Sequence, residues 1–166
     1  EQIISALFGY GSFDETAVLN SSLALYYFAL GLPAFALIKV FSSFFFANHN
    51  TKTPFYISLI SVLLNILISV YYFNKVGFII IPIATTISSW FNGILLFVFL
   101  KNKNLFSFNK IFLIKFVKIV IASIIMGFIF NFLLNFFQNE LAFEQKAKSF
   151  YLVLSALLGL ASYLLI

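Results

Sequence analysis

Five apolar segments, each long enough to cross a lipid bilayer, dominate this sequence. A helix of about 20 apolar residues crosses a hydrocarbon core of about 30 Å, because each residue adds about 1.5 Å. In lipid, only helices and closed barrels satisfy all of their backbone hydrogen bonds. We therefore predict an all-α polytopic membrane protein with five transmembrane helices, joined by short polar connectors. The segments cover residues 16–47, 54–73, 77–100, 111–137 and 149–166.

The composition excludes an ordinary soluble domain. Hydrophobic residues make up 63% of the 166 residues and charged residues make up 9%, whereas a soluble domain holds about 45–50% and about 25%. The absence of cysteine excludes disulfides and thiolate metal sites. We interpret the start without methionine and the end inside an apolar segment as signs of a fragment. Residues 1–16 lack the basic start of a secretory signal, and we expect a loop there.

The placement of lysines predicts how the segments cross the membrane. If successive segments alternate in direction, one side of the membrane receives most of the lysines and the other side receives every acidic residue. Lysine-rich connectors stay in the cytoplasm, so we expect the amino end outside the cytoplasm and the carboxyl end inside it. The lysine-rich side holds Lys52, Lys101, Lys103, Lys110, Lys115 and Lys118; the other side holds Lys75, Lys146, Lys148, Glu1, Asp14, Glu15, Glu140 and Glu144.

Lys39 places a charge inside the first apolar segment, shortly after Gly31 and Pro33. A charge within a bilayer is costly, so it usually lies at a helix end, is paired, or faces a polar cavity. A proline also frees backbone groups that need other partners. Two interpretations stay open: Lys39 lines a substrate cavity together with Ser42 and Ser43, or its side chain extends to the cytoplasmic interface.

Polar residues recur at helical spacing in the second and third segments, so each set lies on one face of its helix. Small polar residues commonly pack membrane helices together. Two facing polar stripes could instead line a hydrated cavity or hold a cation, because hard cations prefer oxygen ligands. Both interpretations stay open. The stripes are Ser58, Ser61, Asn65, Ser69 and Tyr72 in the second segment and Ile81, Thr85, Ser88 and Asn92 in the third.

No set of catalytic residues is evident in the sequence. His49 is the only histidine, and a lone histidine in a connector is usually solvated. Asp14 and Glu15 resemble the acidic pair of a membrane glycosyltransferase, but an acidic pair before a helix is more simply an N-terminal cap. The net charge of +5 is explained by topology and anionic lipid headgroups. We therefore expect neither an enzyme nor a nucleic-acid partner, which would need a solvated basic surface.

Four stretches resemble the MurJ (MviN) family of bacterial lipid II flippases. They are LFGYGSFDETAV at 7–18, GLPAFALIKVFSSFFFANHNTKTPF at 31–55, NILIS at 65–69 and GFIIIPIATTISSWFNGILLF at 77–97. The resemblance covers nearly the whole chain. It implies helices ten to fourteen of a fourteen-helix transporter in the multidrug/oligosaccharidyl-lipid/polysaccharide exporter superfamily. Residues 1–100 would form the second half of the C-terminal lobe, 101–110 a cytoplasmic linker, and 111–166 an appended helix pair.

The resemblance implies transport by alternating access. Two lobes would move about a central cationic cavity and carry lipid II from the cytoplasmic to the periplasmic leaflet of the bacterial inner membrane. The implied partners are lipid II, membrane lipids and the upstream remainder of the same polypeptide, which would carry the diphosphate-binding arginines. Lys39 matches a family lysine in helix ten and would add positive potential to this cavity.

The resemblance also implies a sodium site between helices eleven and twelve, which some family members have. The matching groups are the side chains of Asn65, Ser69 and Thr85 and the carbonyl of Ile81. Ser69 stands where the sodium-binding member has a carboxylate, so we expect weak or lost binding of Na+. We expect no other cofactor.

The last two segments match appended helices that form a groove for the lipid tail. The candidate groove residues are Phe128, Phe132 and Phe136, although contact with membrane lipid explains them equally. Two alternative functions stay open for the whole chain. It could belong to an exporter of another lipid-linked oligosaccharide, or it could be a membrane scaffold subunit that transports nothing.

Overall fold

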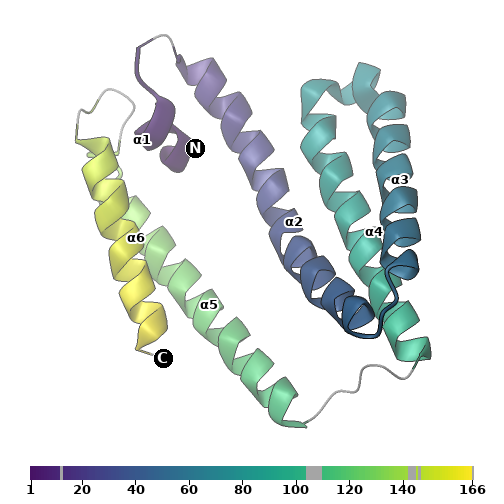
Figure 1. The fold of residues 1–166 in the computed structure, drawn as a ribbon. Coiled ribbons are helices and arrows are strands. Elements are labelled where there is room, and N and C mark those ends of the chain that lie inside the picture. The colour runs from purple at the N-terminus through teal and green to yellow at the C-terminus, as the bar shows by residue number, and fades with distance from the viewer. Residues whose placement is uncertain (12, 104–109, 142–144, 146, 166) are drawn as a thin grey trace. The chain divides into compact units, whose positions relative to one another are not determined.

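The computed structural model describes residues 1–11, 13–103, 110–141, 145 and 147–165. These residues form six α-helices and one short 3-10 helix, without a strand among them, which confirms the all-α prediction. The helices are shown in Figure 1. They are α1 Gln2–Phe8, α2 Glu15–Ala47, α3 Lys52–Val76, η1 Gly77–Ile79, α4 Ile80–Asn102, α5 Lys110–Phe136 and α6 Lys148–Leu164.

Among the described residues, three apolar helical stretches are long enough to cross a membrane: Glu15–Ala47, Lys52–Asn102 and Ile114–Phe136. The second has 51 residues and would be about 77 Å long as a straight helix. It instead reverses direction at η1, so that α3 and α4 lie side by side (Figure 1). This stretch therefore supplies two of the predicted segments. The fifth segment corresponds to α6, whose 17 residues are at the lower limit for a spanning helix.

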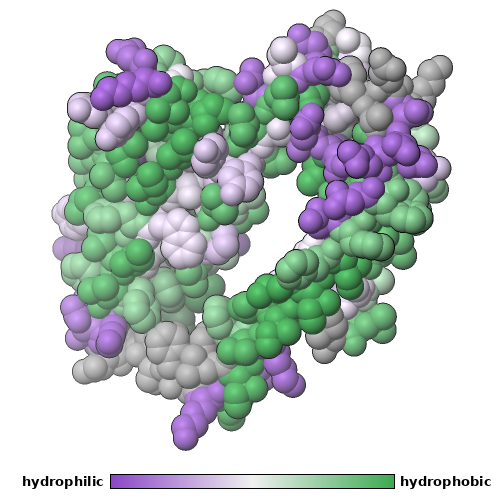
Figure 2. Space-filling model, turned by 180° about the vertical axis from the view of Figure 1, so that it is seen from behind, coloured by the Kyte–Doolittle hydropathy of each residue, from purple (hydrophilic) through white to green (hydrophobic). Residues whose placement is uncertain are grey.

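The described residues fall into two compact units. The hairpin unit lies within residues 23–107 and holds most of α2 together with α3, η1 and α4. The terminal unit lies within residues 1–22 and 108–166 and holds α1, the start of α2, α5 and α6. Figure 2 shows that hydrophobic residues cover the sides of the helices, while hydrophilic residues gather mainly near helix ends. Between 6% and 17% of the residues in the spanning windows are buried, so most apolar side chains face outward, as expected in lipid.

The start of the chain differs from the predicted loop. Residues 2–8 form α1, in which Ile4, Ser5 and Ala6 are buried. Ala6 packs with Leu141 and Leu152 in the core of the terminal unit. A helix of 7 residues is not stable alone, because helix nucleation is costly. Its packing against α6 is what stabilises it, and local sequence gives no sign of that packing.

A side-chain cap begins α2, which confirms the interpretation of the acidic pair as a cap. Asp14 Oδ1 accepts hydrogen bonds from the Ala17 N–H and from the Thr16 hydroxyl, each at 2.8 Å. The bond from the Ala17 amide, and then the bond from Thr16, holds the pKa of Asp14 below its usual range. Glu15 adds a negative charge to the first turn, where the helix dipole favours it.

Small residues let α2 approach α4 closely in the hairpin unit. A Cβ atom at Gly31 would lie 3.0 Å from Thr86 Oγ1. The Thr86 hydroxyl donates to the carbonyl of Tyr27 at 2.6 Å, and Trp90 Nε1 donates to the carbonyl of Leu30 at 3.0 Å. These carbonyls lie just before Pro33, which lacks an N–H and leaves one helix bond unmade. Side chains of α4 therefore bond to the α2 backbone within two turns of the proline.

Lysines separate to opposite ends of the helices within each unit. In the hairpin unit, Lys52 begins α3 and Lys101 is in the last turn of α4, whereas Lys75 lies beside the turn between them. In the terminal unit, Lys110 begins α5 and Lys148 begins the antiparallel α6. Lys146, Glu144 and most of the predicted linker 101–110 lie outside the described residues. The separation follows the predicted pattern.

The turn between α3 and α4 depends on Gly77. Its φ of 73° and ψ of −155° are almost restricted to glycine, and a side chain there costs about 1–3 kcal/mol. A Cβ at Gly77 would have no neighbour within 4 Å, so the cost would come from the backbone alone. We expect Gly77→Ala to lower the melting temperature of the purified full-length protein.

The matched control for this prediction is Gly127→Ala. A Cβ at Gly127 also has no neighbour within 4 Å, but the residue lies inside α5, where alanine is favoured over glycine by about 1 kcal/mol. Its melting temperature should stay equal or rise. Equal losses for the two variants would contradict a special role for the turn.

Candidate functional site

A polar seam joins α3 to α4 in the hairpin unit. Asn65 Nδ2 on α3 donates to Thr85 Oγ1 at 3.1 Å and to Ser88 Oγ at 3.3 Å on α4. The Ser69 hydroxyl donates to Asn65 Oδ1 at 3.4 Å. The two polar stripes of the sequence therefore face each other, and their side chains bond across the helix pair.

The seam offers neutral oxygen atoms and no carboxylate. The Thr85 hydroxyl donates to the Ile81 carbonyl at 2.8 Å, so this carbonyl already serves a side chain of its own helix. Among the described residues, no group of three or more His, Asp or Glu side chains could hold a metal ion. The structure brings Asn65, Ser69, Ile81 and Thr85 together, and a cation site there stays a prediction.

Two cavities border α3, and the smaller one includes this seam. The smaller cavity, about 420 Å³, is lined by Phe35 and Ile38 of α2 and by the facing stripes of α3 and α4. The larger cavity, about 610 Å³, lies at the turn between α2 and α3. The larger cavity is lined by Ser42, Phe46, Thr51, Lys52, Pro54, Phe55, Tyr56 and Ser58.

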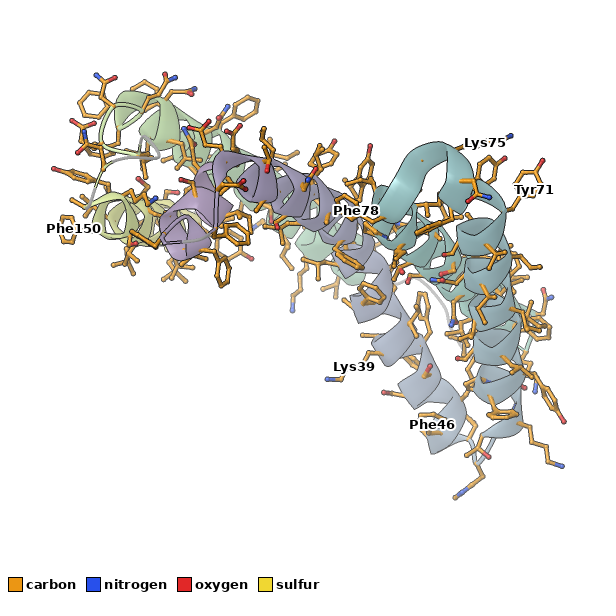
Figure 3. The ribbon with its side chains drawn as sticks, turned by 90° about the horizontal axis from the view of Figure 1, so that it is seen from above. Lys39, Phe46, Tyr71, Lys75, Phe78 and Phe150 are labelled. Carbon is orange, nitrogen blue, oxygen red and sulfur yellow. The ribbon has the colours of Figure 1, made fainter. Side chains whose placement is uncertain are left out.

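Lys39 lies on an open face of α2. Its side chain is exposed, and Figure 3 shows it projecting away from α2 on the side opposite α3. Ser43 is exposed near it and donates to the Lys39 carbonyl at 2.9 Å. Ser42 is instead half-buried and lines the larger cavity. The open face suits both interpretations of Lys39, so its place in a substrate cavity stays a prediction.

The three candidate phenylalanines form an exposed row on α5. Phe128, Phe132 and Phe136 are 72%, 69% and 70% exposed, and the last two rings stack with centroids 6.5 Å apart. Another face of α5 meets α6, where a Cβ at Gly159 would lie 3.6 Å from Phe130. The three phenylalanines therefore take no part in the packing of α5 against α6. Their role as a lipid-tail groove stays a prediction.

The sequence did not single out Lys148, which is fully buried in the terminal unit. Its Nζ donates to the Gly9 carbonyl at 2.7 Å and lies 4.3 Å from the centroid of the Tyr10 ring. The hydroxyls of Ser149 and Tyr10 form a hydrogen bond of 2.8 Å. The Ser149 hydroxyl also donates to the Ala6 carbonyl at 2.5 Å. These bonds fasten α1 to the start of α6. A positive charge in the first turn of a helix is unfavourable because it opposes the helix dipole. This unusual position of Lys148 was the feature of the sequence that could have marked it for a special role.

Comparison with known proteins places these features in a family context. A family model described as "Lipid II flippase MurJ" matches residues 1–152. Similar proteins named "Probable lipid II flippase MurJ" include those of Thermotoga maritima and Rhizobium meliloti. The first is 35% identical over 141 residues, covering 85% of this chain and 28% of the relative. The second is 36% identical over 129 residues, covering 76% of this chain and 24% of the relative.

A third similar protein of the same name, from Rickettsia prowazekii, is 36% identical over 90 residues, covering 54% of this chain and 18% of the relative. The matched regions therefore span between 18% and 28% of the length of these three relatives. The family match contains the whole polar seam, Lys39 and the α1–α6 contact at Lys148.

The buried position of Lys148 predicts the effect of removing its charge. Lys148→Met keeps most of the side-chain volume but loses the bond to the Gly9 carbonyl, and a hydrogen bond to a charged group contributes about 1.5–3 kcal/mol. We expect α1 to separate from α6 more often in the full-length protein. Hydrogen–deuterium exchange of the amides in residues 2–9 should become faster.

The control for this prediction is Lys75→Met. Lys75 is exposed at the end of α3, with Nζ 5.4 Å from the centroid of the Tyr71 ring, so its removal should leave exchange in α1 unchanged. Unchanged α1 exchange in Lys148→Met itself would contradict the assigned role.

Proposed function

Because the chain belongs to the lipid II flippase MurJ family, we propose that it is part of a transporter that moves lipid II from the cytoplasmic to the periplasmic leaflet of the bacterial inner membrane. The observation that carries the proposal is the family match over residues 1–152. The matched regions span 18–28% of the three relatives. Transport is therefore proposed for the whole protein and not for these helices alone.

The long apolar helices place this chain in a bilayer, whose hydrocarbon core is an energetic barrier to the headgroup of lipid II. A diphosphate headgroup cannot cross a hydrocarbon core without charges and hydrogen-bond donors to replace water. A protein lowers that barrier by surrounding the headgroup with a polar cavity. In our proposal Lys39, on the open face of α2, adds positive potential to that cavity, beside Ser42 and Ser43. Diphosphate binding itself falls to residues outside this chain.

The proposed orientation puts the lysine-rich helix ends in the cytoplasm. In the hairpin unit these are the ends at Lys52 and Lys101, and the turn beside Lys75 then lies at the periplasmic face. Figure 3 shows Tyr71 and Lys75 at that turn, and tyrosines with lysines are typical of the membrane interface. The amino end of this chain is then periplasmic and its carboxyl end is cytoplasmic.

Two further roles complete the proposal. The exposed row of Phe128, Phe132 and Phe136 contacts the hydrocarbon tail of the substrate, because its apolar surface is not used between α5 and α6. The cluster at Asn65 binds Na+ weakly, since Ser69 supplies a neutral hydroxyl where a carboxylate would add a full charge. Transport then draws little of its driving force from Na+.

Depletion of the full-length protein tests the function. We expect lipid II to accumulate in the inner leaflet, because its synthesis continues while its translocation stops. The measurement is the fraction of lipid II that an externally added, membrane-impermeant reagent can modify. Normal cell-wall synthesis in a deletion strain without a second flippase would contradict the proposal. Another lipid-linked oligosaccharide that competes fully with lipid II in proteoliposomes would favour a different exporter.

Lys39→Met tests the cavity role of the lysine in the full-length protein. Loss of one favourable charge at a distance costs about 1 kcal/mol of attraction, which corresponds to roughly fivefold slower translocation. The variant should be compared with Lys75→Met, which removes a lysine at the other end of the hairpin unit and should translocate at the normal rate. Normal translocation by Lys39→Met at equal protein level would instead assign Lys39 to the membrane interface.

A further inference from the structure

Asn92 places an unsatisfied oxygen atom inside the hairpin unit. The residue is 8% exposed, and its Oδ1 finds no hydrogen-bond partner among the described residues. Its Nδ2 donates to Ser58 Oγ over a long 3.4 Å. A buried acceptor without a partner costs about 1–3 kcal/mol, and lipid around the helices can supply no donor. The Asn92 amide therefore needs a small donor that reaches it from within the protein.

The cavity around Asn92 is rich in further acceptors. Ser61 and Ser89, which also line it, donate to carbonyls of their own helices at 2.8 Å and 2.6 Å. Their donor hydrogens are used, but their oxygen lone pairs remain able to accept. None of the residues that line this cavity is charged. The cavity thus attracts hydrogen-bond donors and does not attract anions.

Ser58 connects this cavity to the larger one. It lines both cavities and bonds with Asn92 at their junction. The larger cavity reaches Lys52 in the first turn of α3. Ser58 lies about 9 Å along the helix from Lys52, and Asn65 lies about 10 Å further. The two cavities therefore follow α3 from its charged end to the polar seam.

We propose that the two cavities hold a column of ordered water that begins at the Lys52 end of α3 and reaches the Asn65 cluster. Water is the donor that fits neutral acceptors spread over this length. The smaller cavity, about 420 Å³, has room for several molecules, because each takes about 30 Å³ in the liquid. A tightly bound cation would need several oxygens directed at one point, whereas the hydroxyls of Ser61, Ser88 and Ser89 point to backbone carbonyls.

The water column is a property of the hairpin unit that is separate from lipid II transport and does not depend on it. It makes the Asn65 cluster accessible to water-borne solutes from the lysine-rich end of the hairpin unit. It also hydrates the surface between α2 and the α3–α4 pair, where Asn92 would otherwise oppose packing. In this assignment Ser58 and Asn92 are the junction through which water passes.

Cysteine labelling in the full-length protein tests the proposal. The chain has no cysteine, so an introduced cysteine is its only thiol once those elsewhere in the protein are replaced. Ser61→Cys puts a thiol in the smaller cavity at a position that is 5% exposed, and Leu63→Cys puts one on the outer face of α3 at a position that is 52% exposed. The probe is 2-aminoethyl methanethiosulfonate, applied to membrane vesicles.

We expect Ser61→Cys to react at least roughly tenfold faster than Leu63→Cys. The thiolate is the reactive form and it forms in water, whereas lipid around Leu63→Cys raises the pKa of the thiol. Each unit by which the pKa rises removes about nine-tenths of the thiolate. Exposure alone predicts the reverse order. Adding Ser58→Phe should slow the reaction of Ser61→Cys to the Leu63→Cys rate by closing the junction. Adding Leu59→Phe, on an exposed position of α3, is the matched control and should leave the rate unchanged.

Two outcomes would overturn the water column. One is a Ser61→Cys rate no faster than that of Leu63→Cys in protein that elutes as a single species, which would show that the smaller cavity is dry. The other is a Ser61→Cys rate that Ser58→Phe leaves unchanged, which would show that no water passes the Ser58 junction. Labelling needs no lipid II, so either result is independent of whether the protein transports it.

Discussion

Every polar group within these apolar helices must find its partner inside the protein, since lipid offers neither donors nor acceptors. The hairpin unit shows how that requirement shapes the packing. Thr86 and Trp90 donate to α2 carbonyls just before Pro33, and Asn65 bonds across to Thr85 and Ser88. These bonds set which faces of the helices meet. Each is modest in a membrane, about 0.6 kcal/mol on average, but leaving its groups unpaired would cost more.

Close approach makes these bonds possible. Gly31 lets the α2 backbone come within reach of the Thr86 hydroxyl, where a Cβ would stand 3.0 Å from Thr86 Oγ1. At the other end of the unit, apolar side chains fill the contact: Phe41, Phe45, Ile57, Leu96 and Leu100 form its buried core. The unit is therefore polar where small residues bring backbones together and apolar where large residues hold them apart.

Local patterns in the sequence were enough to predict the long helices, the cap at Asp14 and the facing stripes, because each depends on spacing within about one or two turns. Features that depend on distant residues were not predictable. α1 becomes a helix only through its packing on α6, and Lys148 finds the Gly9 carbonyl 139 positions away. The unpaired oxygen of Asn92 likewise emerges only from how three helices pack. The role of Lys39 depends on surroundings that this chain does not itself supply.

Charge and polarity occupy different places in the hairpin unit, and this separation limits what each can do. The seam at Asn65 and Asn92 is built from neutral oxygens and amides, so it offers a diphosphate no positive charge. Lys39 lies on another, exposed face of α2, and Lys52 and Lys101 lie at helix ends. In the two proposals above, Lys39 therefore acts on the open face of α2, while water occupies the space between the helices. Because α2 borders both, a change in its packing against α4 would alter both environments together.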